Sequence, residues 1–364
     1  MNKKTKRKKL RRVLSVIGII LAVLLIYVGF LARSDWNLTR GPDLSLDFTS
    51  IIRDNVSLDA RVIDIAMLGA HNTLSHYITS RSPIDPNEDS APAQHPILLT
   101  IAPGTFARFG RTQLSDLYGL LQRGVRYVDA RITYDGQWYA ENTLLSDYLR
   151  NYLTQLIRFL QENPGELVIF AINDARFGGA VSYSDLFNYM GSVQYNGQSI
   201  FDFVHHDPFT TPIHELLLRD ATQNGQTGGV VILAQAAAFP GGVHYYSRTD
   251  QRRIHHAQQQ TSVIIEYINE EHLFLLNGQH NNMLRVSQSQ LGPVLWGAGL
   301  VDSLLRWSYI RINATHNRNI IDYDGLPDWL ETTPILQFGV ADSSVGNFNQ
   351  RIIEIINEFN RSRR

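Results

Sequence analysis

Short apolar runs bounded by turn residues recur from position 62 to position 341, and this pattern constrains the fold more than any other feature. The runs lie at 62–67, 125–132, 167–172, 230–235, 274–278 and 335–341. Each is close to continuously apolar instead of alternating, which is typical of strands buried on both faces. Sheets made of such strands are covered by helices on both sides. The pattern therefore predicts an α/β protein.

The segment between the second and third runs has the spacing of an amphipathic helix. Apolar residues recur at positions 149, 153, 156, 157 and 160, and an Asn-Pro-Gly turn at 163–165 ends the pattern. A strand, a helix and a strand in this order imply a right-handed parallel crossover. Repeated along residues 63–360, such units give either an α/β barrel or an open doubly wound sheet.

The N-terminus predicts a membrane anchor. Residues 3–12 carry eight Lys or Arg, and residues 13–32 form an uncharged apolar run of 20 residues. A helix of this length spans the ~30 Å hydrocarbon core of a bilayer, and its basic flank is expected to stay in the cytoplasm. We therefore expect a single-pass protein of the cell membrane, with residues 1–12 cytoplasmic, 33–62 a linker and the entry to the domain, and the domain over 63–360 extracellular. A cleaved secretory signal is the alternative.

Charge and cysteine content exclude several classes of function. After the basic segment, the chain holds 25 Lys and Arg against 34 Asp and Glu, so no basic surface for nucleic acid is expected. The chain has no cysteine, which excludes disulfides and zinc sites built on thiolates.

Polar residues stand where the predicted strands end, and in α/β folds the functional residues gather at the carboxyl ends of the strands. The candidates are His71, Asn72, Asp129, Arg131, Asn173, Asp174 and Asp342. Each also has a structural explanation: His71 as a hydrogen-bonded loop residue, Asp129 with Arg131 as a buried ion pair, Asp174 as a turn cap.

Three segments resemble a known family. LGAHNTLSHY (68–77), TQLSDLYGLLQRGVRYVDARITYDGQWY (112–139) and FLQENPGELVIFAIND (159–174) are similar to the X domain of phosphatidylinositol-specific phospholipase C in its bacterial form. The resemblance implies a distorted (β/α)8 TIM-type barrel that cleaves the glycerol–phosphate bond of a phosphoinositide. It implies a phospholipid or inositol phosphate head group as the partner.

The resemblance also assigns roles to residues. His71 matches the general base that takes the proton from the inositol 2-hydroxyl, and a late carboxylate, for which Asp342 is the candidate, orients that histidine. Arg131 stands where bacterial members place an arginine and calcium-dependent members an acid, which implies no metal and no cofactor. Asp129 matches the family's acid two residues earlier. Asn72 is expected in substrate binding with Arg131, as are Asn173 and Asp174.

One departure leaves the activity open. The family has a second histidine after the second strand, as general acid, and this chain has none between His95 and His205. Glu141 with a raised pKa, or His76 or His95 from the preceding loop, are the alternative acids. If no residue replaces the missing acid, the chain is expected to be a head-group binding protein of the same fold, without activity. A glycerophosphodiester phosphodiesterase is less favoured, since Asp129 and Arg131 replace its Glu-x-Asp metal pair.

Overall fold

A ten-stranded sheet forms the centre of the protein. The structure is a computed structural model that describes residues 3–33, 48–88, 103–179, 181–234, 246–247, 251–258, 260–278, 280–291, 309–342 and 347–364. The strands are β1 (Met67–Ala70), β2 (Val125–Tyr134), β3 (Trp138–Asn142), β4 (Leu144–Tyr148), β5 (Leu167–Arg176), β6 (Gly229–Ala234), β7 (Tyr246–Ser247), β8 (Gln251–Gln258), β9 (Leu284–Leu291) and β10 (Ile335–Phe338).

The main path of the sheet runs in the order β7-β6-β5-β2-β1-β10-β9-β8, and every pair along it is parallel. Strands β3 and β4 form an antiparallel hairpin that continues from β2. The sheet curls strongly, as one hydrogen bond across its interior shows. The Tyr127 hydroxyl on β2 donates to Gln251 Oε1 on β8 at 2.9 Å. These strands are four places apart, which would separate them by about 19 Å in a flat sheet. The fold is thus α/β, with a curled parallel sheet of the barrel type.

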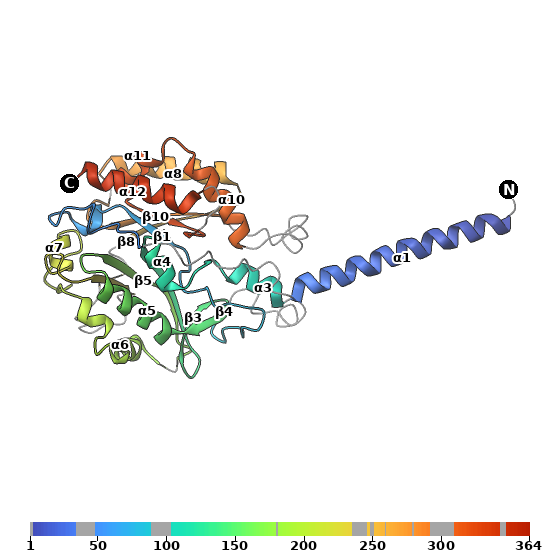
Figure 1. The fold of residues 1–364 in the computed structure, drawn as a ribbon, viewed down its shortest axis with the longest axis horizontal. Helices are drawn as coiled ribbons and strands as arrows, with labels where there is room; N and C mark the ends of the chain where they lie inside the picture. Colours follow the sequence, from blue (N-terminus) through green and yellow to red (C-terminus); the bar gives the residue numbers. More distant parts are fainter. Residues whose placement is uncertain are drawn as a thin grey trace.

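Helices cover the outside of this sheet, with α5 and α6 on one side and α8, α10, α11 and α12 on the other (Figure 1). The helices are α1 (Lys3–Arg33), α3 (Pro103–Gly110), α4 (Leu117–Gln122), α5 (Leu149–Glu162), α6 (Tyr183–Ser192), α7 (Leu218–Ala221), α8 (Thr261–Leu276), α10 (Tyr309–Ile321), α11 (Leu326–Thr332) and α12 (Phe348–Ser362), and the short 3-10 helices are η1 (Val62–Asp64) and η2 (Ile200–Phe203). The hairpin β3–β4 and α3 lie at the end of the body from which α1 projects, and the C-terminus lies at the other end.

The alternation of side chains along β2 separates a polar interior from an apolar outer layer. Val128, Ala130 and Ile132 pack outward in one buried cluster with α5, which contributes Tyr152 and Leu156. The positions between them carry Asp129 and Arg131, and Tyr127 precedes Val128, so these three side chains share the opposite face. The sequence pattern of α5 is confirmed, and it is this apolar packing that fixes the direction of the functional side chains.

The folded body begins before the predicted boundary at residue 63. Ile51 and Ile52 are fully buried in the core. Glu166 accepts hydrogen bonds from the Ser50 hydroxyl at 2.7 Å and from the Arg53 amide at 3.2 Å, and it forms a buried ion pair with Arg126 at 2.7 Å. Within the predicted linker and domain entry over 33–62, residues from about 50 onward thus pack onto the folded body through the buried Glu166 carboxylate.

The predicted transmembrane helix over residues 13–32 is not supported. The chain is helical from Lys3 to Arg33. Across the side chains that the structure describes, however, no helix combines the length and the apolar character that a membrane crossing requires.

Four of the six predicted strands are confirmed with small shifts, as β2, β5, β6 and β10. The run at 62–67 is mostly the 3-10 helix η1, and the strand β1 starts only at Met67. The strand expected at 274–278 is wrong, because its first residues end helix α8. Strands β8 and β9 were missed, since QRRIHHAQ and LRVSQSQL carry too many polar residues to read as buried strands.

Candidate active site

The candidate site lies at the carboxyl ends of β1, β2 and β5. His71 follows β1 directly, and its amide donates to Phe338 O at the end of β10. The same end of β2 carries Asp129 and Arg131, and β5 carries Asn173 and Asp174 in parallel register beside them. The structure thus brings together the residues expected at the ends of three neighbouring strands.

Asp129 is the carboxylate that faces His71. Its Oδ2 lies 3.2 Å from Nδ1 of the imidazole, and both side chains are buried. Asn173 donates to Oδ1 at 2.8 Å, and Gln337 donates from Nε2 to Oδ2 at 2.7 Å. A buried carboxylate needs such donors to remain charged, and these bonds also fix its orientation toward the imidazole.

A layer of amides extends these bonds across the interior of the sheet. Gln337 accepts from Gln288 on β9 at 2.7 Å, while Asn173 accepts from Gln251 on β8 at 2.8 Å and donates to the Tyr127 hydroxyl at 3.2 Å. Fully satisfied buried networks of this kind rigidify the groups they include. Asp129 is consequently positioned from both sides of the curled sheet.

His71 is also fixed by its ring and its backbone. The ring of Tyr309 on α10 stacks on the imidazole, with centroids 5.9 Å apart and planes 29° from parallel. Nε2 of Gln113 donates to the carbonyl of His71 at 2.6 Å, and the Thr112 hydroxyl donates to the same oxygen at 2.9 Å. Burial raises the pKa of Tyr309, so this phenol stays neutral beside the imidazole.

Asn72 serves the backbone turn that presents His71. It adopts φ of 42°, a left-handed conformation that asparagine tolerates better than most residues. Its amide donates to Asp129 Oδ2 at 3.2 Å, and its side-chain Oδ1 is buried without a hydrogen bond in the described structure. That unsatisfied oxygen is the part of Asn72 that remains for a ligand.

Arg131 and Glu141 face each other on β2 and β3. Ile132 pairs with Ala140 in antiparallel register, so Arg131 and Glu141 are the next pair along these two strands. Nε of Arg131 is buried and has no hydrogen-bond partner among the residues that the structure describes. Its charge acts on both the Glu141 carboxyl and the Tyr309 phenol, which places the guanidinium within electrostatic range of both.

The Glu141 carboxyl group has a pKa close to neutral pH. Burial raises its pKa to about 7, although the charges of Arg176 and Arg131 act in the opposite direction. Oε2 accepts from the Thr143 amide at 2.9 Å, whereas Oε1 is buried and makes no hydrogen bond in the described part of the chain. A carboxyl group with this pKa can donate a proton at neutral pH.

Arg176 is a functional candidate that the sequence analysis missed. It forms ion pairs with Glu88 and, at 2.7 Å, with Asp174, and it lies 3.9 Å from Asp85 and from Glu141. Burial alone would lower its pKa, but Glu141 and the other acids raise it overall. The sign that could have found it is its place on β5, two residues beyond Asp174 and so on the same face.

Three comparisons relate this chain to known proteins. No protein-family model matches the chain. A PI-PLC X-box domain-containing protein of Dictyostelium discoideum is 28% identical over 133 residues, and PI-PLC X domain-containing protein 3 of Bos taurus is 28% identical over 116 residues. These matches cover 36% and 30% of this chain but only 17% and 36% of the relatives' own length.

Solved structures agree at the level of the fold. A phosphatidylinositol-specific phospholipase C of Staphylococcus aureus superposes with a TM-score of 0.55 at 12% identity, covering 83% of this chain and 94% of that one. The Listeria monocytogenes enzyme gives 0.50 at 13% identity, covering 82% and 97%. The chain resembles the PI-PLC X-domain family in sequence and in fold. The substrate named for those enzymes applies to the relatives alone.

Within this X-domain-like fold, Asp342 does not stand where the sequence analysis expected it. The carboxyl accepts from the Leu114 amide at 3.3 Å, and burial raises its pKa. It therefore holds the segment 113–115 that carries Gln113. The carboxylate beside the imidazole is Asp129, so the expectation that Asp342 orients His71 is replaced.

The structure also distinguishes between the residues that were considered as alternative general acids. Nη2 of Arg111 lies 3.2 Å from Nδ1 of His76. Burial, together with the charge of Arg111, lowers the pKa of His76 to about 4. It is therefore neutral at pH 7 and has no proton of the right acidity to give. His95 lies outside the described residues. Asp174 is engaged by Arg176, and Asn173 by the network around Asp129.

No group of three His, Asp or Glu side chains within the described ranges is arranged to hold a metal ion. The four acids within ion-pair distance of Arg176 share that guanidinium as their cation.

Proposed function

We propose that this chain is a phosphodiesterase of the phosphatidylinositol-specific phospholipase C type, acting on the glycerol–phosphate bond of a phosphoinositide. The observation that carries the proposal is the buried His71–Asp129 pair beside Arg131 at the carboxyl ends of adjacent strands. The curled sheet shared with the bacterial enzymes and the X-domain relatives support it.

His71 acts as the general base in the first half of the reaction. With Nδ1 directed at Asp129, Nε2 is the nitrogen that accepts the proton of the inositol 2-hydroxyl. The hydroxyl oxygen then attacks phosphorus and forms the cyclic phosphate. Asp129 stabilises the imidazolium that results, and its orientation is held by Asn173 and Gln337.

Arg131 stabilises the negative charge that develops on the phosphate oxygens. A guanidinium offers two parallel donors that match a phosphate, and its charge is worth most in a site that excludes water. The buried Nε without a partner leaves a donor for this contact.

Glu141 supplies the proton that the missing second histidine would give. As the bond between phosphorus and the glycerol oxygen breaks, the protonated carboxyl transfers its proton to that oxygen, so diacylglycerol leaves as an alcohol. A pKa of about 7 keeps roughly half of the group protonated at neutral pH. The proposal is supported by the electrostatic effect of Arg131 on Glu141, which indicates that the two side chains lie close together.

The second candidate is a head-group binding protein of the same fold that does not turn its ligand over. It is favoured by the absence of a second histidine, since loss of a general acid reduces rates by about 10²- to 10⁴-fold. In this case Arg131 and Asn72 still hold the phosphate and the ring.

The test is release of cyclic inositol phosphate from phosphatidylinositol in mixed micelles by the full chain. We expect turnover that persists in chelator and is abolished by His71→Ala. Binding of inositol 1-phosphate without turnover, lost in Arg131→Gln, would favour the head-group binder. Activity that chelator removes and a divalent cation restores would contradict the role of Arg131.

A further inference from the structure

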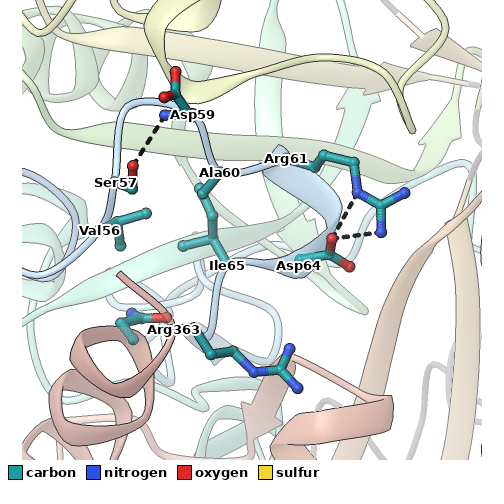
Figure 2. Close-up of a pocket in the computed structure, with 9 residues that line it drawn as sticks. Val56, Ser57, Asp59, Ala60, Arg61, Asp64, Ile65 and Arg363 are labelled. Carbon is teal, nitrogen blue, oxygen red and sulfur yellow. Dashed lines mark hydrogen bonds and ion pairs between the residues drawn. The ribbon is translucent and has the colours of Figure 1, made fainter.

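A second pocket lies at the opposite end of the sheet from His71. It has a volume of about 280 Å³ and lies between the segment 56–65 and the end of α12 (Figure 2). Ile65 lines it two residues before β1 begins, whereas His71 follows the end of that strand. Because the strands of the main path are parallel, this pocket belongs to their amino ends. Its volume is at the small end for ligand pockets.

Positive charge gathers around one carboxylate at this pocket. Figure 2 shows Asp64 between the guanidinium groups of Arg61 and Arg363. Arg61 binds Asp64 from Nε at 2.7 Å and from Nη2 at 2.6 Å. Arg285 on β9 donates from Nη2 to Asp64 Oδ1 at 3.3 Å. Two guanidinium groups therefore pair with this one acid, and Arg363 adds a third positive charge to the lining of the pocket.

The other acid that lines the pocket does not offset this excess, because Asp59 forms an ion pair with Arg219. The side chain of Arg285 is only 8% exposed, and its Nε makes no hydrogen bond in the described structure. Burial, with smaller contributions from the charges of Arg61 and Arg363, lowers the pKa of Arg285. A buried cation with an unsatisfied donor is costly unless an anion completes its surroundings.

The remaining wall of the pocket is apolar. Val56 and Ile65 are buried, and Ala60 packs against the same core cluster. A bare inorganic anion would leave this wall without a partner. A phosphate with a short carbon chain matches both sides, since arginines bind phosphate through paired donors and the wall accepts the carbon atoms.

We propose that this pocket binds a small phosphate monoester, with the phosphate held by Arg61 and Arg363, which line the pocket, and the carbon chain against Val56, Ala60 and Ile65. The charge of Arg285, paired with Asp64, adds to the attraction for the anion. The site is separate from His71 and Arg131, and it does not depend on the proposed activity. It is a second anion site, at the amino end of the barrel.

The test is calorimetric titration of the full chain with n-butyl phosphate and with inorganic phosphate, at constant ionic strength. Both titrations use an Arg131→Gln background, which removes phosphate binding at the candidate active site. We expect one saturable site, tighter for butyl phosphate, and weaker by about tenfold or more in Arg363→Gln, as for loss of a charged hydrogen bond. Arg361→Gln is the matched control, since it removes the same charge from the same helix end but does not line the pocket.

Equal weakening by Arg361→Gln and Arg363→Gln would show that the anion responds to surface charge alone, and would overturn the site. Equal affinity for inorganic and butyl phosphate would overturn the ester assignment. Arg61→Gln provides a second variant at an exposed position, so a folding defect of one variant does not decide the result. No saturable binding of either probe would end the proposal.

Discussion

Asp129 Oδ2 lies 3.2 Å from His71 Nδ1, and the same oxygen accepts from Gln337 Nε2 at 2.7 Å. This relationship gives Asp129 the position beside His71 that the sequence analysis expected for Asp342. If Asp129 stabilises the imidazolium, Asp129→Asn should lower kcat by about 10²- to 10⁴-fold with a smaller change in KM. Asp342→Asn, which alters a carboxyl bonded to Leu114, should have a much smaller effect on kcat.

The control for this prediction is the double variant Asp129→Asn with His71→Ala. Residues that act as a unit are not additive, so the double variant should be no slower than His71→Ala alone. Thermal unfolding of each variant checks that the buried network survives. Independent, multiplicative losses would show that Asp129 acts elsewhere than through His71.

The upper limb of the pH–rate profile should report Glu141. Burial raises its pKa to about 7, so the protonated form that donates to the leaving group is lost as the pH rises through 7. Glu141→Gln should remove this limb and slow phosphatidylinositol cleavage by about 10²-fold or more. A substrate with an activated phenolate leaving group needs no proton, and its rate should change little. Equal slowing of both substrates would show that Glu141 supports the structure of the site and does not donate the proton.

Arg176 should determine the pH at which the upper limb of the pH–rate profile falls. Its positive charge opposes the effect of burial on Glu141, so Arg176→Gln should raise the pKa of Glu141 further and move the limb to higher pH. The pH dependence of kcat measures this shift. Arg158→Gln is the matched control, because it removes an arginine from an exposed pair with Glu162 on α5. A limb that stays in place in Arg176→Gln would mean that another group titrates there.

The parts of the fold that could be predicted are those in which local pattern and burial agree. The continuous apolar runs of β2 and β5 and the helical spacing of α5 each fit one environment, and the structure confirms them. Strand β9 could not be predicted, since its sequence LRVSQSQL contains four consecutive polar residues although all of its residues are buried. The reason is that Gln288 faces a polar interior, where it bonds its register partner Gln337 on the neighbouring strand β10, a strand that lies far along the sequence.

The same limit applies to the candidate site. Strand-end placement was enough to select His71, Asp129 and Arg131, because the ends of parallel strands converge. It was not enough to choose between Asp129 and Asp342, which depends on which side of the backbone each carboxyl occupies. Tyr309 gave no signal, since it arrives from a helix far along the sequence and contacts His71 only in three dimensions.

Stability should fall in mild acid because of His316. This residue is fully buried, its ring nitrogens lie 2.9 Å from Thr261 Oγ1 and 3.0 Å from Ser289 Oγ, and burial lowers its pKa to about 4. The folded state keeps it neutral while the unfolded chain binds a proton near pH 6.5, so its contribution is present above pH 6.5 and is lost as the pH falls toward 4.

For His316 alone, this linkage removes about 2 kcal/mol of the free energy of unfolding between pH 7 and pH 5. His316→Gln keeps a donor and an acceptor for the two hydroxyls but cannot titrate in this range. Urea unfolding at both pH values should therefore show a smaller pH dependence for the variant than for the wild type, by about that amount. An identical slope for wild type and His316→Gln would mean that His316 is already protonated, or solvated, in the folded state.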